Sequence, residues 1–281
     1  MNRKNIPFAL AVVTSLLVAL APCSSAQNAS PQEGASGYHL LKTIPVGGTE
    51  GWDYVTMDSN ARRLYIGRDD HIDVVDVDTG TVVGKVTGLS HVHGLVLAPD
   101  LDRGFTSDGD ANTSTIVDLR NLQKIGTAKT GKDPDSFVYD EVTKRVFIMN
   151  SAGNDAIAIN GAEGTVAGTV WLEGQPEFAV SDGKGGIFVN ITDKNQMLEF
   201  DGRSFKVLHR YSLAPCEGPS GLSMDRKNRR LFSVCDNQKM VVMDADTGKV
   251  IAGLPTGAGT DGSLFDPDTQ MRLVQPVDVE P

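Results

Sequence analysis

The sequence has few of the features on which haem proteins, serine hydrolases and helical bundles depend. It contains three cysteines in 281 residues and no Cys-x-x-Cys-His string for haem attachment. No stretch has a helical period longer than two turns. Gly218-Pro219-Ser220-Gly221 differs from the Gly-x-Ser-x-Gly elbow of hydrolases, and Gly183-Lys184-Gly185-Gly186 resembles a phosphate loop only in its glycines. These absences exclude the common motif-bearing enzymes.

Basic residues are also scarce. The sequence has 26 Lys and Arg against 36 Asp and Glu, and its formal net charge is −10. The longest basic cluster, residues 226–230, follows Asp225 and is interpreted as a solvated turn between two strands. Because so acidic a protein repels phosphate backbones, we expect no nucleic acid among its partners.

The N-terminus has the order of a secretory signal peptide. Arg3 and Lys4 precede an apolar run over residues 6–21, and small residues then allow cleavage after Ala26. The run is shorter than the ~20 residues that span a bilayer. We predict a signal peptide at 1–26, a flexible linker at 27–37 and a periplasmic or secreted mature chain without a membrane span. A retained anchor and a lipid on Cys23 are the alternatives.

Two cysteines, Cys216 and Cys235, remain after that cleavage. Exported proteins meet an oxidising compartment, where a cysteine pair is usually bridged. Antiparallel pairing of residues 222–225 with 230–233 would also bring the two cysteines together. The sequence therefore predicts a disulfide, with free thiols or a metal pair as the alternatives.

A repeat of about 42 residues runs through the rest of the sequence. Each unit has a short apolar run that ends at an anchor residue, usually Asp, then a polar turn and a second run with a central aromatic. The steps between these aromatics are 40, 42, 41 and 44 residues, for Tyr65, Phe105, Phe147, Phe188 and Phe232. The string Asp76-Val77-Asp78-Thr79-Gly80 returns 168 residues later as 244–248 and favours a tight hairpin over a calcium loop.

Four strands in 40–45 residues are typical of a propeller blade. The predicted fold class is all-β, a β-propeller over residues 38–275, with units starting near 47, 88, 131, 174, 218 and 257. Five units are complete and the sixth is partial. The tail at 276–281 is expected to be irregular, and residues 38–46 to form an outer strand that closes the last blade. This count favours a C-terminally truncated or frame-shifted chain over a compact six-bladed ring.

Several of these strings resemble the YVTN-repeat propellers of the YncE-like family. They are Ile187-Phe188-Val189-Asn190, the Asp-x-Asp-Thr-Gly turns, and His93-Gly94-Leu95 followed by Ala98-Pro99-Asp100. The resemblance covers about residues 40–270. It implies an exported bacterial protein with a seven-bladed propeller and, usually, no assigned reaction. The fold is well specified in this way, whereas the function is not.

Alignment of the units exposes a polar position five residues before each anchor. In a propeller the first strand of each blade lines the channel, so these side chains should converge at one mouth. We call them the channel-mouth ring: Asp53, His93, Asp135, Glu177, Ser220 and Asp261. Carboxylates and imidazole suit a cation or a polar ligand. The alternative is that each side chain only caps its own loop.

Other residues near the ring are weaker candidates for binding. His91 lies two residues from His93, so both could face one ligand. Trp52 and Phe178 lie beside Asp53 and Glu177 and could stack a flat ligand, although packing between blades is the commoner use. Residues 108–114 carry alternating oxygens but lack the later ligands of a calcium loop, which favours a hairpin loop.

No complete catalytic set emerges from these candidates. We therefore expect a non-catalytic binding or scaffold module whose small-molecule or protein partner binds at the channel mouth. No cofactor is predicted apart from the option of a divalent cation at the ring. The alternatives are a metal-dependent, lactonase-like hydrolase or another periplasmic propeller enzyme, and a degenerate fragment without its own function.

Overall fold

The computed structural model of the chain describes residues 38–48 and 51–276. Contacts divide the chain into Met1–Lys42 and Thr43–Pro281, and the 21 strands of the described residues all lie in the second part. No helix among the described residues is long and apolar enough to cross a membrane. The predicted signal peptide, the linker and residues 277–281 lie outside the described residues.

Five antiparallel sheets contain these strands, each in chain order. The seven-stranded sheet comprises β1 (Val55–Asp58), β2 (Arg63–Gly67), β3 (Asp69–Asp76), β4 (Thr81–Ala98), β5 (Arg103–Asp108), β6 (Thr113–Asp118) and β7 (Gln123–Lys129). Three four-stranded sheets follow. They are β8 (Pro134–Asp140), β9 (Arg145–Asn150), β10 (Asp155–Asn160) and β11 (Val166–Trp171); β12 (Pro176–Ser181), β13 (Gly186–Ile191), β14 (Gln196–Asp201) and β15 (Val207–Ser212); and β16 (Pro219–Asp225), β17 (Arg230–Cys235), β18 (Lys239–Asp244) and β19 (Val250–Pro255). The last sheet pairs β20 (Thr260–Asp266) with β21 (Met271–Pro276).

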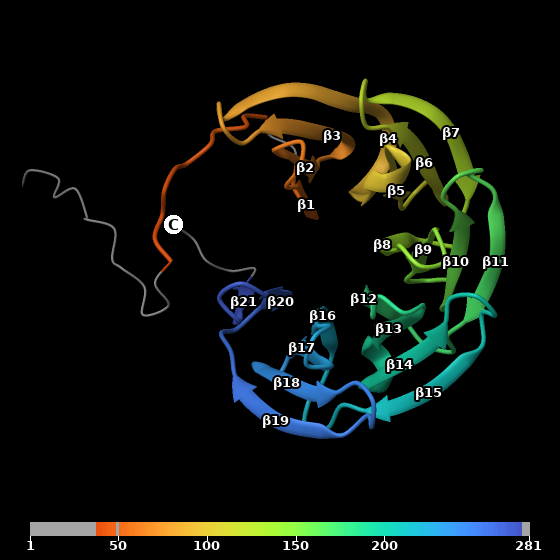
Figure 1. Cartoon of the computed structure of the whole chain (residues 1–281), viewed down its shortest axis with the longest axis vertical. Helices are drawn as coiled ribbons and strands as arrows, with labels where there is room; N and C mark the ends of the chain where they lie inside the picture. Colours follow the sequence, from red (N-terminus) through yellow and green to blue (C-terminus); the bar gives the residue numbers. More distant parts are fainter. Residues whose placement is uncertain (1–37, 49–50, 277–281) are drawn as a thin grey trace, which may run out of the picture. The chain divides into compact units, whose positions relative to one another are not determined.

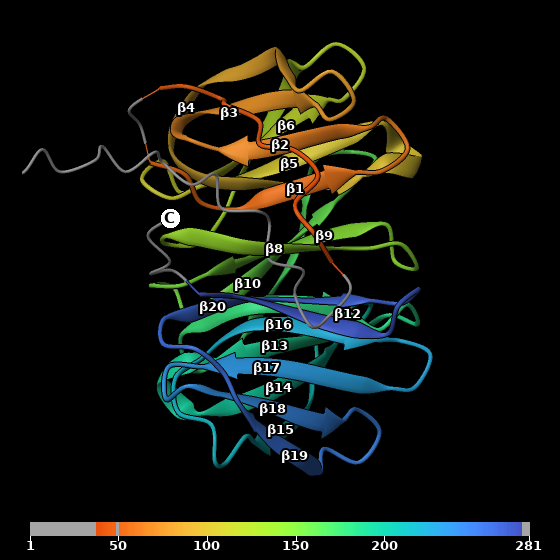
Figure 2. The ribbon, with the colours of Figure 1, turned by 90° about the vertical axis from the view of Figure 1, so that its left-hand side faces the viewer.

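Within Thr43–Pro281 the sheets follow one another around a common axis. The strands β1, β8, β12, β16 and β20 lie innermost and β7, β11, β15 and β19 outermost (Figure 1), and Figure 2 shows the same succession from the side. The outermost strands are mainly exposed, whereas the middle strands are buried over most of their length. This arrangement confirms the predicted all-β propeller fold.

The strand β4 is unusual because it belongs to two units at once. Its first part pairs with β3, from Thr81 opposite Asp76, and its last part pairs with β5, ending with Ala98 opposite Arg103. One 18-residue strand therefore serves as the outer strand of the first unit and the inner strand of the second.

The recurring aromatics pack each unit against the next. Phe147 of β9 lies in a core with Ile187 and Val189 of β13, and Phe188 lies in a core with Leu231 of β17. Each such side chain is at most 1% exposed: Tyr65, Phe105, Phe147, Phe188 and Phe232. Complete burial of a large apolar side chain is worth about 1.5–3 kcal/mol. The aromatic repeat seen in the sequence is therefore the contact between neighbouring units.

The Asp-Thr-Gly strings form hairpin turns, as predicted. The Asp76 carboxylate accepts hydrogen bonds from the backbone of Asp78 and Thr79 at 3.1 and 2.8 Å, and Gly80 has a φ of +71°. The carboxylate of Asp244 makes the same bonds in the later copy. Residues 109–112 likewise form a hairpin loop between β5 and β6, and 226–229 form a turn between β16 and β17. Turn capping explains these acidic strings without calcium.

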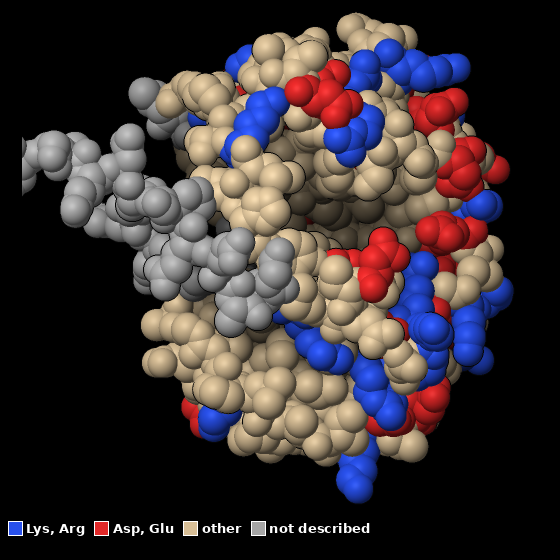
Figure 3. Space-filling model, turned by 60° about the vertical axis from the view of Figure 1, so that its left-hand side comes forward, with Lys and Arg blue, Asp and Glu red and all other residues tan. Residues whose placement is uncertain are grey.

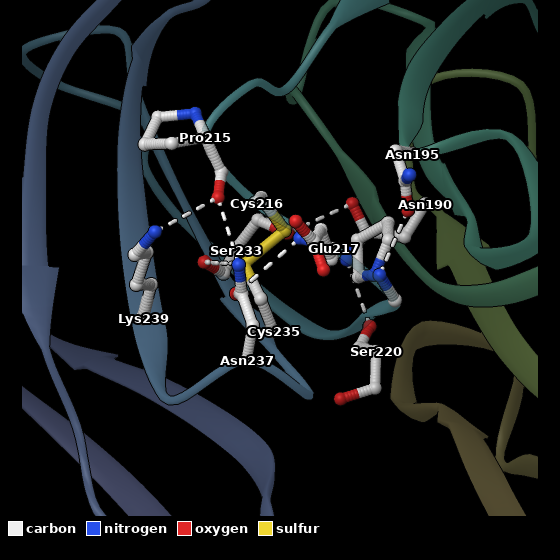
Figure 4. Close-up of a disulfide and its surroundings, with 12 residues drawn as sticks. Asn190, Asn195, Pro215, Cys216, Glu217, Ser220, Ser233, Cys235, Asn237 and Lys239 are labelled. Atoms are coloured by element: carbon white, nitrogen blue, oxygen red, sulfur yellow. Dashed lines mark hydrogen bonds between the residues drawn. A yellow bond between two sulfur atoms is a disulfide. The ribbon is translucent and has the colours of Figure 1, made fainter.

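The predicted disulfide between Cys216 and Cys235 is present, with Cα atoms 5.5 Å apart (Figure 4). It joins the segment before β16 to the end of β17, where Pro219 pairs with Cys235. The same segment is held by Asn237, which donates to the Pro215 carbonyl at 2.9 Å. Both cysteines lie in the buried core between the sheet of β12–β15 and the sheet of β16–β19.

One expectation about the ends of the propeller is wrong. Residues 38–46 carry no strand, although their pattern predicts an outer one. Edge strands depend on a partner with free backbone groups, and a local pattern does not say whether that partner exists. The seven-blade count and the truncation stay predictions.

Replacement of both cysteines, C216A/C235A, is expected to lower the free energy of unfolding by about 3 kcal/mol, because an open 19-residue loop gains chain entropy when the chain unfolds. Urea denaturation with and without reductant measures the loss. Reductant should destabilise the natural chain and leave the double variant unchanged. Equal stability of the two chains under oxidising conditions would contradict this account.

Candidate functional site

The channel-mouth ring lies at the beginning of the innermost strand of successive units. Asp53 lies two residues before β1. The other members lie on strands: His93 on β4, Asp135 on β8, Glu177 on β12, Ser220 on β16 and Asp261 on β20. The shared position in the repeat therefore becomes a shared position in space.

Hydrogen bonds between neighbouring units fix this position. The Tyr54 amide donates to the His93 carbonyl at 3.0 Å, and the Ser136 hydroxyl donates to the Glu177 carbonyl at 2.5 Å. Each bond joins the residue after a ring position to the backbone of the ring position in the next unit. The inner strands are thus held together at the ring itself.

Ser220 differs from the other members because its side chain is used within the fold. It is 8% exposed, and its hydroxyl donates to the Asp261 carbonyl at 3.3 Å. This bond joins Ser220 to the next unit rather than capping its own loop, and the other ring positions carry four carboxylates and one imidazole.

Asp53, His93 and Asp135 come together most closely. The Nδ1 atom of His93 lies 2.7 Å from an Asp53 carboxylate oxygen and 3.6 Å from an Asp135 oxygen. One possible ligand atom from each residue lies within 4.8 Å of the others. The side chains of His93 and Asp135 are only 16% and 20% exposed, whereas Asp53 is 48% exposed. This N/O set matches ligands of borderline divalent metals.

His91 approaches His93 but engages a different carboxylate. The two imidazole rings pack edge to face with centroids 4.7 Å apart, while His91 Nδ1 lies 2.9 Å from an Asp69 oxygen. The structure therefore brings the predicted histidine pair together, and His91 packs against the imidazole of His93.

Aromatic side chains pack against one another next to the ring. The Tyr54 ring lies 5.1 Å from that of Phe137 and 5.0 Å from that of Phe178. A Cβ atom on Gly94 would lie 2.6 Å from Tyr54 and 2.9 Å from Phe137, so no larger residue fits there. Phe178 thus takes part in packing between units, as the commoner interpretation predicts. Trp52, which is 60% exposed, lies outside these aromatic pairs.

The carboxylates of the ring oppose one another's ionisation. Burial, with the negative charges of Asp135 and Asp261, raises the pKa of Glu177 to about 8. Burial also raises the pKa of Asp135 to about 6, although the charge of His93 acts against the rise. The pKa of Asp261 is raised too, mainly by burial. The ring consequently carries protons near neutral pH that ordinary carboxyl groups would have lost.

The ring carboxylates also shift the pKa values of Tyr54 and His93. Burial and the charges of Asp135, Glu177, Asp53 and Asp261 all raise the pKa of the Tyr54 phenol. Burial lowers the pKa of His93, but its hydrogen bond to Asp53 and the charge of Asp135 outweigh burial and raise it. Four ring carboxylates therefore contribute to the raised pKa of one phenol.

A separate hollow of about 280 Å³ lies toward the other ends of the same inner strands. Its lining mixes apolar side chains, among them Val138, Leu222 and Met224, with Arg226 and serines, and it contains no carboxylate. None of the ring residues is among them, so the two ends of the inner strands differ in chemistry.

Sequence reasoning missed Tyr54, which contacts Phe137 and Phe178, and it missed Phe137, which lies two residues after Asp135. A signal was available at the position after each ring residue, which is occupied by Tyr54, Gly94, Ser136, Phe178, Gly221 and Gly262. The two large aromatics at this position, Tyr54 and Phe178, stand out among small residues, and they contact each other.

The substitution E177Q is expected to stabilise the chain at high pH. The folded chain holds the Glu177 proton up to about pH 8, while the unfolded chain loses it near the ordinary value of 4.5. The contribution of this group to stability is therefore full below pH 4.5 and is lost as the pH rises through 8. Glutamine avoids this loss, so E177Q should gain about 1–3 kcal/mol over the natural chain at pH 9 and nearly nothing at pH 5.

Chemical denaturation of both chains at several pH values measures the difference. The control is E141Q, which removes an exposed glutamate in the turn after β8. A gain that is independent of pH, or one shared by E141Q, would show that ionisation of Glu177 does not destabilise the folded chain.

Comparison with known proteins supports the fold and leaves the family open. No protein-family model matches the sequence, and no curated protein does. Among solved structures, the chain resembles hydrazine synthase of Kuenenia stuttgartiensis with a TM-score of 0.58, over 86% of this chain and 99% of that chain, at 14% identity. The chains of known structure that match number 1621. So widely shared a fold does not specify a function.

Proposed function

We propose that the chain is an exported, YncE-like β-propeller that binds a positively charged ligand at the channel-mouth ring and performs no reaction on it. The observation that carries the proposal is the close approach of Asp53 and Asp135 to one another around His93, and the raised pKa values of Asp135, to about 6, and Glu177, to about 8, agree with it. Like charges held close together in a partly buried place attract any cation that neutralises them.

Several features support a cation over an anion or a neutral ligand. His93 is the basic partner recorded for both Asp53 and Asp135 among the described residues, so a single imidazole faces several carboxylates. The partly exposed aromatic side chains of Tyr54 and Phe178 lie next to the ring, and aromatic faces also favour cations. Figure 3 shows one hollowed face of the molecule with acidic side chains beside the hollow.

Export is the second part of the proposal. It is supported by the order of residues 1–26 and by the disulfide between Cys216 and Cys235, a bond that persists in oxidising compartments. The resemblance of the repeat strings to YVTN-repeat propellers agrees with a bacterial, periplasmic or secreted protein.

A metal-dependent hydrolase is the second candidate, and the Asp53–His93–Asp135 group is the observation that favours it. Such an enzyme needs a metal-bound water as its nucleophile. Zinc-loaded protein can be assayed with a simple lactone and with p-nitrophenyl acetate. Hydrolysis that is lost in D135N would support the enzyme, whereas equal rates for both chains would eliminate it.

Hexaamminecobalt(III), a trication that keeps its own ligands, is the probe for the proposed function. Calorimetry at low salt should find one strong site, which weakens with added salt because ions screen the ring. Binding should tighten as the pH rises from 5 to 9, since protons on Asp135 and Glu177 compete with the cation below about pH 6 and pH 8.

The double variant D135N/E177Q should weaken this binding by at least about tenfold, or about 1.4 kcal/mol. The matched control E141Q/D268N removes two exposed acidic side chains elsewhere and should bind as the natural chain does. Equal binding by the ring variant and the natural chain would refute the proposed function.

A further inference from the structure

We propose that Asp53, His93 and Asp135 hold a divalent transition-metal ion of the zinc type, with the His93 Nδ1 atom as its nitrogen ligand. This inference rests on the proposed function, because it names the cation and the ring members that bind it directly. The three residues come from the first three repeat units, which the chain brings together at one point.

The position of the His93 Nδ1 atom is the first argument. It faces two carboxylates, at 2.7 Å from Asp53 and 3.6 Å from Asp135. A hydrogen on Nδ1 satisfies one carboxylate at most, whereas a metal ion accepts the imidazole lone pair and both carboxylates together. Because no lysine or arginine ion pair is recorded for either aspartate among the described residues, a dication would also balance their charge.

The rigidity of the imidazole is the second argument. His91 packs edge to face on the His93 ring and is itself held by Asp69 at 2.9 Å. On the other side, a Cβ on Gly109 would lie 3.0 Å from His93 Nε2 and 3.0 Å from His91, so the backbone closes in there. The His93 imidazole is therefore packed between His91 and the backbone of Gly109. Metal sites depend on such supporting contacts to orient their ligands.

The Nε2 atom of His93 supplies a third observation. It is buried and has no hydrogen-bond partner among the described residues. Nε2 is thus not the nitrogen that the described residues position, and Nδ1 is the atom that faces the two carboxylates.

The ligand types select the class of metal. One imidazole and two carboxylates suit Zn²⁺, Co²⁺ or Mn²⁺, while Mg²⁺ and Ca²⁺ prefer oxygen ligands alone. Zinc takes His nitrogen and Asp oxygen at about 2.0–2.2 Å. Asp53, which is half exposed and precedes β1, is the ligand with the freedom to close the remaining separation. Three protein ligands leave a fourth position for water or a bound molecule.

Co²⁺ is the test ion because its visible absorption reports the ligands that it has bound. Purified chain freed of metal by a chelator is titrated with Co²⁺, and Zn²⁺ is then added as a competitor. We expect new absorption bands at one equivalent, which Zn²⁺ removes. The variants H93Q and D53N should weaken Co²⁺ binding by about 100-fold, the loss seen when a metal site is disrupted.

Matched controls are H209Q, an exposed histidine on β15, and D268N, an exposed carboxylate in the turn between β20 and β21. Both should keep the absorption bands and bind Co²⁺ within about threefold of the natural chain. Circular dichroism of every variant checks that it folds, and D53N changes a half-exposed side chain that the core does not need. Unchanged Co²⁺ bands in folded H93Q or D53N would overturn the inference.

The outcome separates this inference from the proposed function. Hexaamminecobalt(III) cannot take a protein ligand into its coordination sphere, so its binding tests the acidic ring alone. If it binds while Co²⁺ keeps the spectrum of the hydrated ion, the metal site is wrong and the cation-binding ring stands. If neither ion binds at the ring, both proposals fail.

Discussion

The burial of one aromatic side chain per unit against the following unit is the contact on which the fold depends. Each sheet alone has two faces to cover, and Tyr65, Phe105, Phe147, Phe188 and Phe232 cover one face of the next unit at almost complete burial. Protein interiors are close-packed, so the size of these rings sets the distance between successive sheets. The radius at which the inner strands meet follows from that distance.

The channel-mouth ring is a consequence of this spacing. A polar residue at one repeat position becomes a cluster only because the units are held around one axis. The resulting repulsion among Asp135, Glu177 and Asp261 opposes folding, and packing between the units outweighs it. Sites that bind charged ligands commonly contain like charges that repel one another, because a bound ligand of opposite charge relieves the repulsion.

The sequence was sufficient for features that depend on local chemistry or on the repeat. The hairpin turns follow from Asp, Thr and Gly at fixed spacing, and the Cys216–Cys235 bond follows from the pairing of β16 with β17. Features that depend on side chains from different units could not be predicted. The approach of His93 to both Asp53 and Asp135, and the contact of Tyr54 with Phe137 and Phe178, require the width of the axis.

The continuity of β4 has a dynamic consequence. In most of the fold a loop separates the outer strand of one unit from the inner strand of the next, and such loops are points where neighbouring units can open independently. Between β3 and β5 there is no such point, because one strand hydrogen-bonds to both. We therefore expect the backbone around His93 to open together with its partners in both units, and slow local opening there would keep the imidazole in register with its carboxylates.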